Sequence, residues 1–140
     1  MSIFTKRWND PYSAADGWRI LICRYRPRAL KKADETWHTW FSSLGPSKKL
    51  HADAYGKNRA APITFEQYKR RYLTEMQKNI PNNLIVCLAR IVALGGKITL
   101  LCSSACTNEN KCHRSLLKEL ILTYATEATQ KKIIRTKTYP

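Results

Sequence analysis

The sequence has no long apolar run, no apolar leader and no low-complexity segment or internal repeat. No stretch approaches the roughly 20 apolar residues that a membrane helix needs. The first residues, MSIFTKRWNDP, also lack the apolar segment of a secretion signal. We therefore expect a cytoplasmic protein with no membrane partner. The hydrophobic fraction of 44% is ordinary for a globular domain, so global disorder is not expected.

Acidic residues are scarce: 10 Asp and Glu stand against 25 Lys and Arg, which gives a net charge of +15. Such an excess favours contact with a phosphate-rich partner, nucleic acid or nucleotide. A generally basic, soluble surface explains the same charge without any ligand. The charge alone therefore does not identify a function.

The five cysteines are odd in number, and no secretion signal accompanies them. A disulfide framework is therefore not expected, which leaves buried thiols, a metal site or a reactive thiol. Cys87 falls on an apolar segment with helical spacing and is predicted to be a buried, inert thiol. Three others, Cys102, Cys106 and Cys112, fall in one stretch, Lys97–Tyr124.

Hydrophobic patterning predicts one α/β domain over residues 1–124, with a small, mainly parallel sheet flanked by helices in a Rossmann-like three-layer arrangement. Strands are expected at Ser2–Arg7, Trp18–Cys23 and Lys97–Cys102. Helices are expected from Asp34 to Leu44, from Thr64 to about Asn79, from Pro81 to Gly95, and from Cys112 to Tyr124. The segment between the first two is expected to be irregular, with one short helical turn at Lys48–Tyr55. Residues 125–140 are expected to be a basic segment that forms either a short strand around Lys132–Thr136 or a tail that orders on a partner.

The segment after the second strand, RYRPRA, places three arginines at alternating positions around Pro27. Proline restricts the backbone on both sides, so this loop should be stiff. Each guanidinium group can bind two oxygens of a phosphate or carboxylate. We predict that Arg24, Arg26 and Arg28 bind an anion. Alternatively, they pair with carboxylates of the protein itself or face solvent.

Cys112, His113 and Arg114 lie where the polar loop after the third strand gives way to a helix. Free backbone N–H groups and the positive end of the helix dipole favour anions there. A thiol in that position should have a lowered pKa, and the thiolate is the reactive form. Cys112 and His113 are therefore predicted to be a reactive pair, and Arg114 an anion ligand. The spacing does not fit a cysteine phosphatase loop, because Asn108 occupies the position six residues before the arginine.

A metal site is an alternative use of the same stretch. Zinc prefers thiolate and imidazole ligands, and the stretch contains four of them: Cys102, Cys106, Cys112 and His113. Two features count against it: Cys102 ends a strand and should face the core, and the adjacent Cys112 and His113 rarely reach one ion together. In a third alternative the buried thiols are structural and close the loop.

Several stretches in this order resemble the family known as domain of unknown function 488. They are TKRWNDP (Thr5–Pro11), DGWRILICRYRPRAL (Asp16–Leu30), FEQYKRRYLTEM (Phe65–Met76), and LLC with CHRSLLKEL (Leu100–Cys102, Cys112–Leu120). The resemblance covers most of the chain and implies a small single-domain α/β fold with no established activity. Cys102 and the Cys-His-Arg triplet match the family pattern, whereas Cys106 is not part of it.

The chain departs from that family in the arginine loop. The family usually has an aspartate-arginine pair followed by a Trp-Pro-Arg-Gly turn. Here Cys23 stands in place of the acid, Arg26 in place of the tryptophan and Ala29 in place of the glycine. These changes make the loop more basic.

Three loops follow predicted strands: Arg7–Pro11, Arg24–Ala29 and Ser103–Arg114. Ligands of open parallel sheets bind at the carboxyl ends of the strands, so these loops should converge on one basic crevice if the strands are neighbours. We predict that the crevice binds a phosphate-bearing ligand, nucleic acid or nucleotide, and no cofactor is predicted. A non-catalytic nucleic-acid-binding protein that uses surface lysines and residues 125–140 is the alternative. The sequence leaves open whether the site is catalytic.

Overall fold

The computed structural model describes residues 1–57 and 61–137. Its four strands are all parallel and form one sheet in the order β1-β4-β2-β3. The strands are β1 (Ser2–Arg7), β2 (Trp18–Leu21), β3 (Thr39–Trp40) and β4 (Lys97–Cys102). The prediction of a single α/β domain with a small parallel sheet is confirmed.

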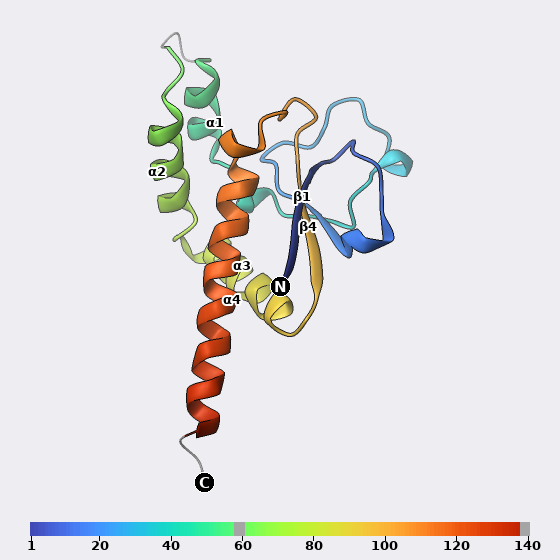
Figure 1. Cartoon of the computed structure of the whole chain (residues 1–140). Helices are drawn as coiled ribbons and strands as arrows, with labels where there is room; N and C mark the ends of the chain where they lie inside the picture. The colour runs from blue at the N-terminus through green and yellow to red at the C-terminus, as the bar shows by residue number, and fades with distance from the viewer. Residues whose placement is uncertain (58–60, 138–140) are drawn as a thin grey trace.

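Four α-helices gather on one side of this sheet (Figure 1). They are α1 (Lys48–Tyr55), α2 (Phe65–Glu75), α3 (Asn79–Ala93) and α4 (His113–Lys137). The predicted capping box at the start of α2 is present, with the side chains of Thr64 and Gln67 each accepting a backbone N–H of the other. Within the described residues, no helix is both long and apolar enough to cross a membrane.

The two faces of the sheet differ because side chains alternate along each strand. On the helix side, Ile20, Ile98 and Leu100 are fully buried against residues such as Leu88 of α3 and Leu117 of α4. The other face is covered by the segments that join β1 to β2 and β2 to β3. These connections are short and contain only 3-10 turns among the described residues, so this third layer is largely irregular.

A buried ion pair lies under that irregular layer. The guanidinium of Arg19, which is 0% exposed, donates to Asp16 at 2.5 Å and to the carbonyl of Thr36 at 2.7 Å. Asp16 also binds Lys6 Nζ at 2.7 Å and accepts the backbone N–H of Ser13. Burial by itself raises the pKa of Asp16, but the hydrogen bonds from Lys6, Ser13 and Arg19 outweigh it and leave that pKa below its usual value.

The helix predicted upstream of the Gly45–Pro46 pair is wrong. Thr39–Trp40 forms β3 instead, and the N–H of Phe41 donates to the carbonyl of Leu21 at 2.9 Å. The free edge of β2 therefore offers a partner that overrides the helical spacing, and aromatic and β-branched residues suit a strand. The aromatic side chains are also divided, with Trp37 buried on the loop side and Phe41 packed against the helix-side core.

Helix α4 continues through Lys137, so the strand expected around residues 132–136 is not formed. No proline or glycine interrupts the sequence of this helix. Ala125 is still buried in the core, and the last turns extend beyond the sheet toward the C-terminus (Figure 1). A strand in this segment would also have needed an open sheet edge beside it, whereas the helix satisfies its own backbone.

Cys87 is exposed, so its predicted burial is wrong. It lies on α3, whose packing face carries Ile85, Leu88 and Val92. The segment is apolar around most of its circumference, so the sequence pattern did not show which face packs against the core.

Candidate ligand cavity

The loops predicted to converge do meet, around a cavity of about 590 Å³. Because β4 lies between β1 and β2 in a parallel sheet, the carboxyl ends of all three strands are neighbours. Helix α1 and the start of α2 complete the wall, in the upper part of Figure 1. Trp8 lines the cavity from the first loop, Arg24–Arg28 from the second, and Ser103 with Cys106 from the third.

The charged side chains in the cavity lining are all cationic. Among the described residues of the lining, four are basic and none is Asp or Glu; the basic residues are Arg24, Arg26, Arg28 and Lys111. Arg24 donates its Nε–H to the carbonyl of Pro46 at 2.8 Å, which leaves the rest of the guanidinium available. Arg28 is exposed and forms no hydrogen bond or ion pair within the described part of the chain.

Arg26 is matched inside the protein. Its guanidinium contacts Glu35 Oε1 at 2.8 and 2.9 Å and donates to the carbonyl of Leu30 at 2.9 Å. This is the alternative in which an arginine of the loop pairs with a carboxylate of the protein itself. Arg26 therefore shapes the loop, and anion binding by Arg24 and Arg28 stays a prediction.

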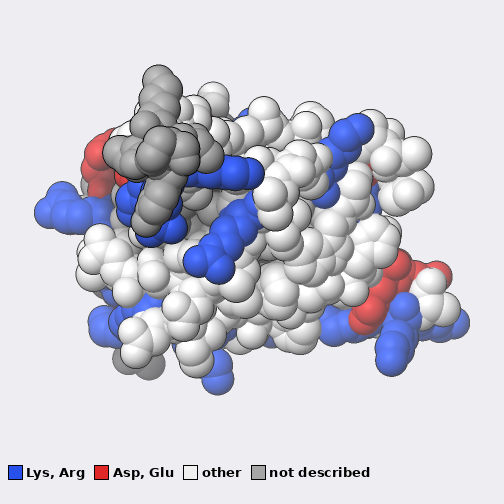
Figure 2. Space-filling model, turned by 90° about the horizontal axis from the view of Figure 1, so that it is seen from below, with Lys and Arg blue, Asp and Glu red and all other residues white. Residues whose placement is uncertain are grey.

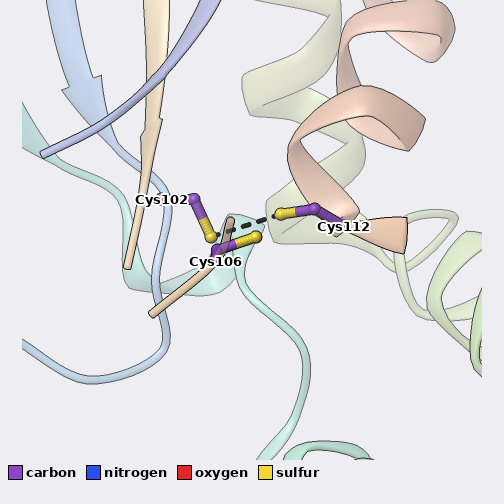
Figure 3. Close-up of side chains that lie close together, drawn as sticks. All are labelled: Cys102, Cys106 and Cys112. Atoms are coloured by element: carbon purple, nitrogen blue, oxygen red, sulfur yellow. Dashed lines mark hydrogen bonds between the residues drawn. The ribbon is translucent and has the colours of Figure 1, made fainter. Parts of the chain in front are cut away.

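Three thiols form the floor of the cavity (Figure 3). Cys102 ends β4, Cys106 lies in the following loop, and Cys112 immediately precedes α4. Their Sγ atoms all lie within 4.8 Å of one another, and the thiol of Cys112 donates to Cys102 at 3.3 Å. Cys102 and Cys112 are buried, whereas Cys106 is partly exposed. The sequence pointed to Cys106 only as a ligand of the alternative metal site, because this residue is not part of the family pattern and its loop is irregular.

The pKa values of the three thiols are shifted in different directions. Hydrogen bonds from Cys102 and Cys112 lower the pKa of Cys106, and the nearby charge of Arg114 adds to this effect. The pKa values of Cys102 and Cys112 are raised, chiefly by their hydrogen bonds to Cys106 and Cys102, respectively. The pKa that is lowered in this cluster is therefore that of Cys106, whereas the sequence predicted a lowered pKa for Cys112. The reactivity of Cys112 with His113 stays a prediction.

His113 is buried beside the thiols. Its Nε2 lies 2.8 Å from the carbonyl oxygen of Ile22, and since a carbonyl only accepts, Nε2 carries the proton. Nδ1 then presents its lone pair to the sulfur atoms of Cys102 and Cys112, each 4.0 Å away. Burial lowers the pKa of His113, which keeps the ring neutral.

Comparison with known proteins gives this fold and site a family. A family model described as "Active DUF488-N3 subclade" matches residues 3–125. The chain belongs to that family. The Escherichia coli K12 protein YeaO is 30% identical over 112 residues, which are 79% of this chain and 90% of YeaO. The proteins Rv3073c of Mycobacterium tuberculosis H37Rv and Mb3100c of Mycobacterium bovis are each 24% identical over 106 residues, 76% of this chain and 81% of theirs. All three are named as uncharacterized proteins, and no solved structure matches.

Backbone contacts explain how this DUF488 member holds its basic loop. A Cβ at Gly45 would lie 2.4 Å from the backbone nitrogen of Arg24, so only glycine allows this close approach. Trp40 donates its indole N–H to the carbonyl of Cys23 at 2.8 Å. Ala29 has a φ of 57°, a conformation that glycine adopts with less strain.

The predicted anion ligand Arg114 does not line the cavity. It is 5% exposed, and its Nη2 donates to the carbonyl of Cys106 at 3.3 Å. Its buried Nε has no hydrogen-bond partner among the described residues. The side chain instead binds the backbone of the loop that carries Cys106. Arg114 therefore positions that loop.

The sequence interpretation missed an aromatic wall. His51 of α1 lies between Tyr25 and Tyr55, with ring centroids 5.2 and 4.7 Å away, and Tyr68 of α2 also lines the cavity. Burial raises the pKa of Tyr68, so it stays a neutral phenol. Two signals were available: a tyrosine between the arginines of the loop, and the i, i+4 spacing of His51 and Tyr55.

Proposed function

We propose that the protein binds a nucleotide in this cavity, with its phosphate at Arg24 and Arg28. The observation that carries the proposal is a lining with four cationic side chains and no carboxylate. The volume of about 590 Å³ lies within the range of small-molecule sites. A phosphate would supply the negative charge that the lining lacks and would accept charge-assisted hydrogen bonds from the guanidinium groups.

The aromatic wall favours a nucleotide over inorganic phosphate. Tyr25, His51 and Tyr55 place three rings together at the cavity. Stacking of a base on an aromatic side chain contributes about 1–3 kcal/mol. One site therefore offers both parts of the recognition, cations for the phosphate and rings for the base.

A single nucleotide suits this site better than a long strand. Figure 2 shows the end of the molecule away from the cavity, where the amino ends of the strands lie. Basic side chains lie around the edge of this face and in part of its interior, acidic groups lie at its edge, and wide uncharged areas separate them. The visible part of this face thus shows no continuous basic track along which a nucleic-acid backbone could lie.

The predicted reactive pair lies on the floor of the same cavity. His113 Nδ1 is 4.0 Å from Cys112 Sγ, and this proximity is what supports keeping the two as a predicted reactive pair. The proposal of nucleotide binding does not depend on this chemistry. Phosphorus NMR of a bound nucleotide would show whether the protein also converts it. If it does, the Cys112→Ala variant should bind the nucleotide without converting it.

The test is calorimetric titration with AMP and adenosine. We expect AMP to bind at least about 10-fold more tightly, because hydrogen bonds to charged groups contribute about 1.5–3 kcal/mol. Arg28→Ala should weaken AMP binding about 10- to 100-fold on the same grounds and leave adenosine binding nearly unchanged. The matched control is Arg90→Ala, which removes an exposed arginine on α3 outside the lining.

Equal affinity for AMP and adenosine would exclude recognition of the phosphate. Equal losses in Arg28→Ala and Arg90→Ala would show that net charge, and not the cavity, determines affinity. Binding of a single-stranded oligonucleotide that is insensitive to Arg28→Ala would support the surface nucleic-acid binder instead.

A further inference from the structure

We propose that the floor of the cavity is a zinc site, formed by the end of β4, the loop after it and the start of α4. The four ligands are Cys102, Cys106, Cys112 and His113. Thiolates and imidazole are the ligands that zinc prefers in proteins, and four of them complete a tetrahedral site. The proposal rests on the positions of these side chains and not on nucleotide binding.

The spacing of the thiols fits one ion. With zinc–sulfur bonds of about 2.3 Å, two thiolates on a tetrahedral ion lie roughly 3.8 Å apart. The three Sγ atoms lie within 4.8 Å of one another, and the pair from Cys102 and Cys112 is 3.3 Å apart. Figure 3 shows the side chains of all three turned toward a common centre. Side-chain shifts of about 1 Å or less therefore suffice to close them around an ion.

The fourth ligand is already oriented. Nδ1 of His113 lies 4.0 Å from two of the sulfur atoms, close to the roughly 3.6 Å expected for nitrogen and sulfur on one zinc ion. Its Nε2–H is held by the carbonyl of Ile22 at 2.8 Å. Metal-binding histidines are typically held in this way, with the other ring nitrogen donating to a carbonyl or carboxylate.

Arg114 supports the site from outside. It donates to the carbonyl of Cys106 at 3.3 Å and so holds the loop on which that ligand lies. Three thiolates and a zinc ion carry a net charge of −1, and the buried guanidinium offsets it at close range. Arg114 is thus a positioning residue for the zinc site.

A complete set of four protein ligands makes this site structural. The ion would tie the loop after β4 to the start of α4 and so stiffen the cavity floor. It would also occupy the electron pairs that the predicted reactive pair, Cys112 and His113, would use. Zinc-loaded protein should therefore show no thiol reactivity at this position.

The test is titration of Co²⁺ into the full chain after it has been freed of metal and reduced, with no nucleotide present. We expect one ion per chain, with thiolate-to-cobalt charge-transfer absorption and the intense visible bands of a tetrahedral ion. Zinc should displace the cobalt and raise the melting temperature. Because AMP binding is measured separately on metal-free protein, failure of either proposal is visible without the other.

Variants identify the ligands. Cys106→Ser changes a partly exposed loop residue and should weaken Co²⁺ binding at least about 100-fold. His113→Gln should weaken it about 10- to 100-fold and shift the visible bands. The matched control is Cys87→Ser, which removes the exposed thiol of α3 and should leave the titration unchanged.

Alkylation of the unmodified chain gives a readout that does not depend on the folding of a variant. Zinc should protect Cys106 from iodoacetamide and leave Cys87 reactive. The proposal is overturned if Co²⁺ gives only weak octahedral bands, or if Cys87→Ser weakens binding as much as Cys106→Ser. Equal alkylation of Cys106 with and without zinc would overturn it as well.

Discussion

The loop-covered face of the sheet and the carboxyl ends of its strands both hold arginine, in opposite settings. On the face, Arg19 is fully buried and its charge is matched by Asp16 at 2.5 Å. At the strand ends, Arg28 is exposed beside a cavity whose lining contains no carboxylate. The two arginines are only nine positions apart in the sequence: Arg19 lies within β2 and Arg28 lies in the loop that follows it.

The difference separates charge that stabilises the fold from charge that is available to a ligand. A buried guanidinium without a partner is strongly unfavourable, so Arg19 requires its carboxylate. Partly solvated cations around a cavity have a smaller desolvation cost, so they can remain unpaired until an anion binds. Arg26 lies between the two cases, because it is near the cavity but is paired with Glu35. Each prediction below changes one side of this comparison.

The largest effect is expected from Asp16→Asn. Removing the carboxylate leaves Arg19 buried without its partner, so the free energy of unfolding should fall by about 3–5 kcal/mol. Urea unfolding at neutral pH measures this loss. Asp34→Asn, at an exposed carboxylate, is the control and should change stability little. A loss below about 1 kcal/mol for Asp16→Asn would mean that the pair is not needed for stability.

The same pair should give the stability an acid dependence. The pKa of Asp16 is lowered in the folded protein, so its contribution is present above the unfolded pKa of 3.8 and is lost as the pH falls through the folded value. The difference in free energy of unfolding between the wild type and Asp16→Asn should therefore shrink as the pH is lowered below the pKa of the carboxyl in the unfolded chain. A difference that grows with acid would contradict this sign.

A smaller effect is expected from Glu35→Gln, which releases Arg26 toward the cavity. AMP affinity should rise about 2- to 5-fold, because the change removes a negative charge close to the phosphate site. The pair is partly exposed, at 31% and 24%, so stability should change by about 1 kcal/mol or less. Paired AMP and adenosine titrations check the result, and a rise seen equally for adenosine would not come from charge.

Added salt should have the smallest effect on the stability that the buried Asp16–Arg19 pair contributes, and a clear effect on AMP binding in the cavity. Exposed charges are screened over about 10 Å at 0.1 M salt, whereas buried pairs are screened much less. AMP affinity should therefore fall steadily with added salt, while the stability difference caused by Asp16→Asn should hardly change. Equal salt dependence of both quantities would remove the distinction between the two regions.

Much of this protein follows from the sequence by itself. The strands at Ser2–Arg7 and Lys97–Cys102 and the capping box at Thr64 depend on residues a few positions apart. The convergence of three loops was also predictable, because parallel neighbouring strands bring their carboxyl ends together.

Only the tertiary structure decided which side chains meet in the cavity. Strand β3 exists because β2 has a free edge to pair with, and that pairing outweighs a local helical pattern. Through the path of an irregular loop, Cys106 joins the other thiols, and Arg114 binds the carbonyl of Cys106 without lining the cavity. Such contacts join residues distant in sequence or in unpatterned segments, so periodicity and capping signals carry no information about them.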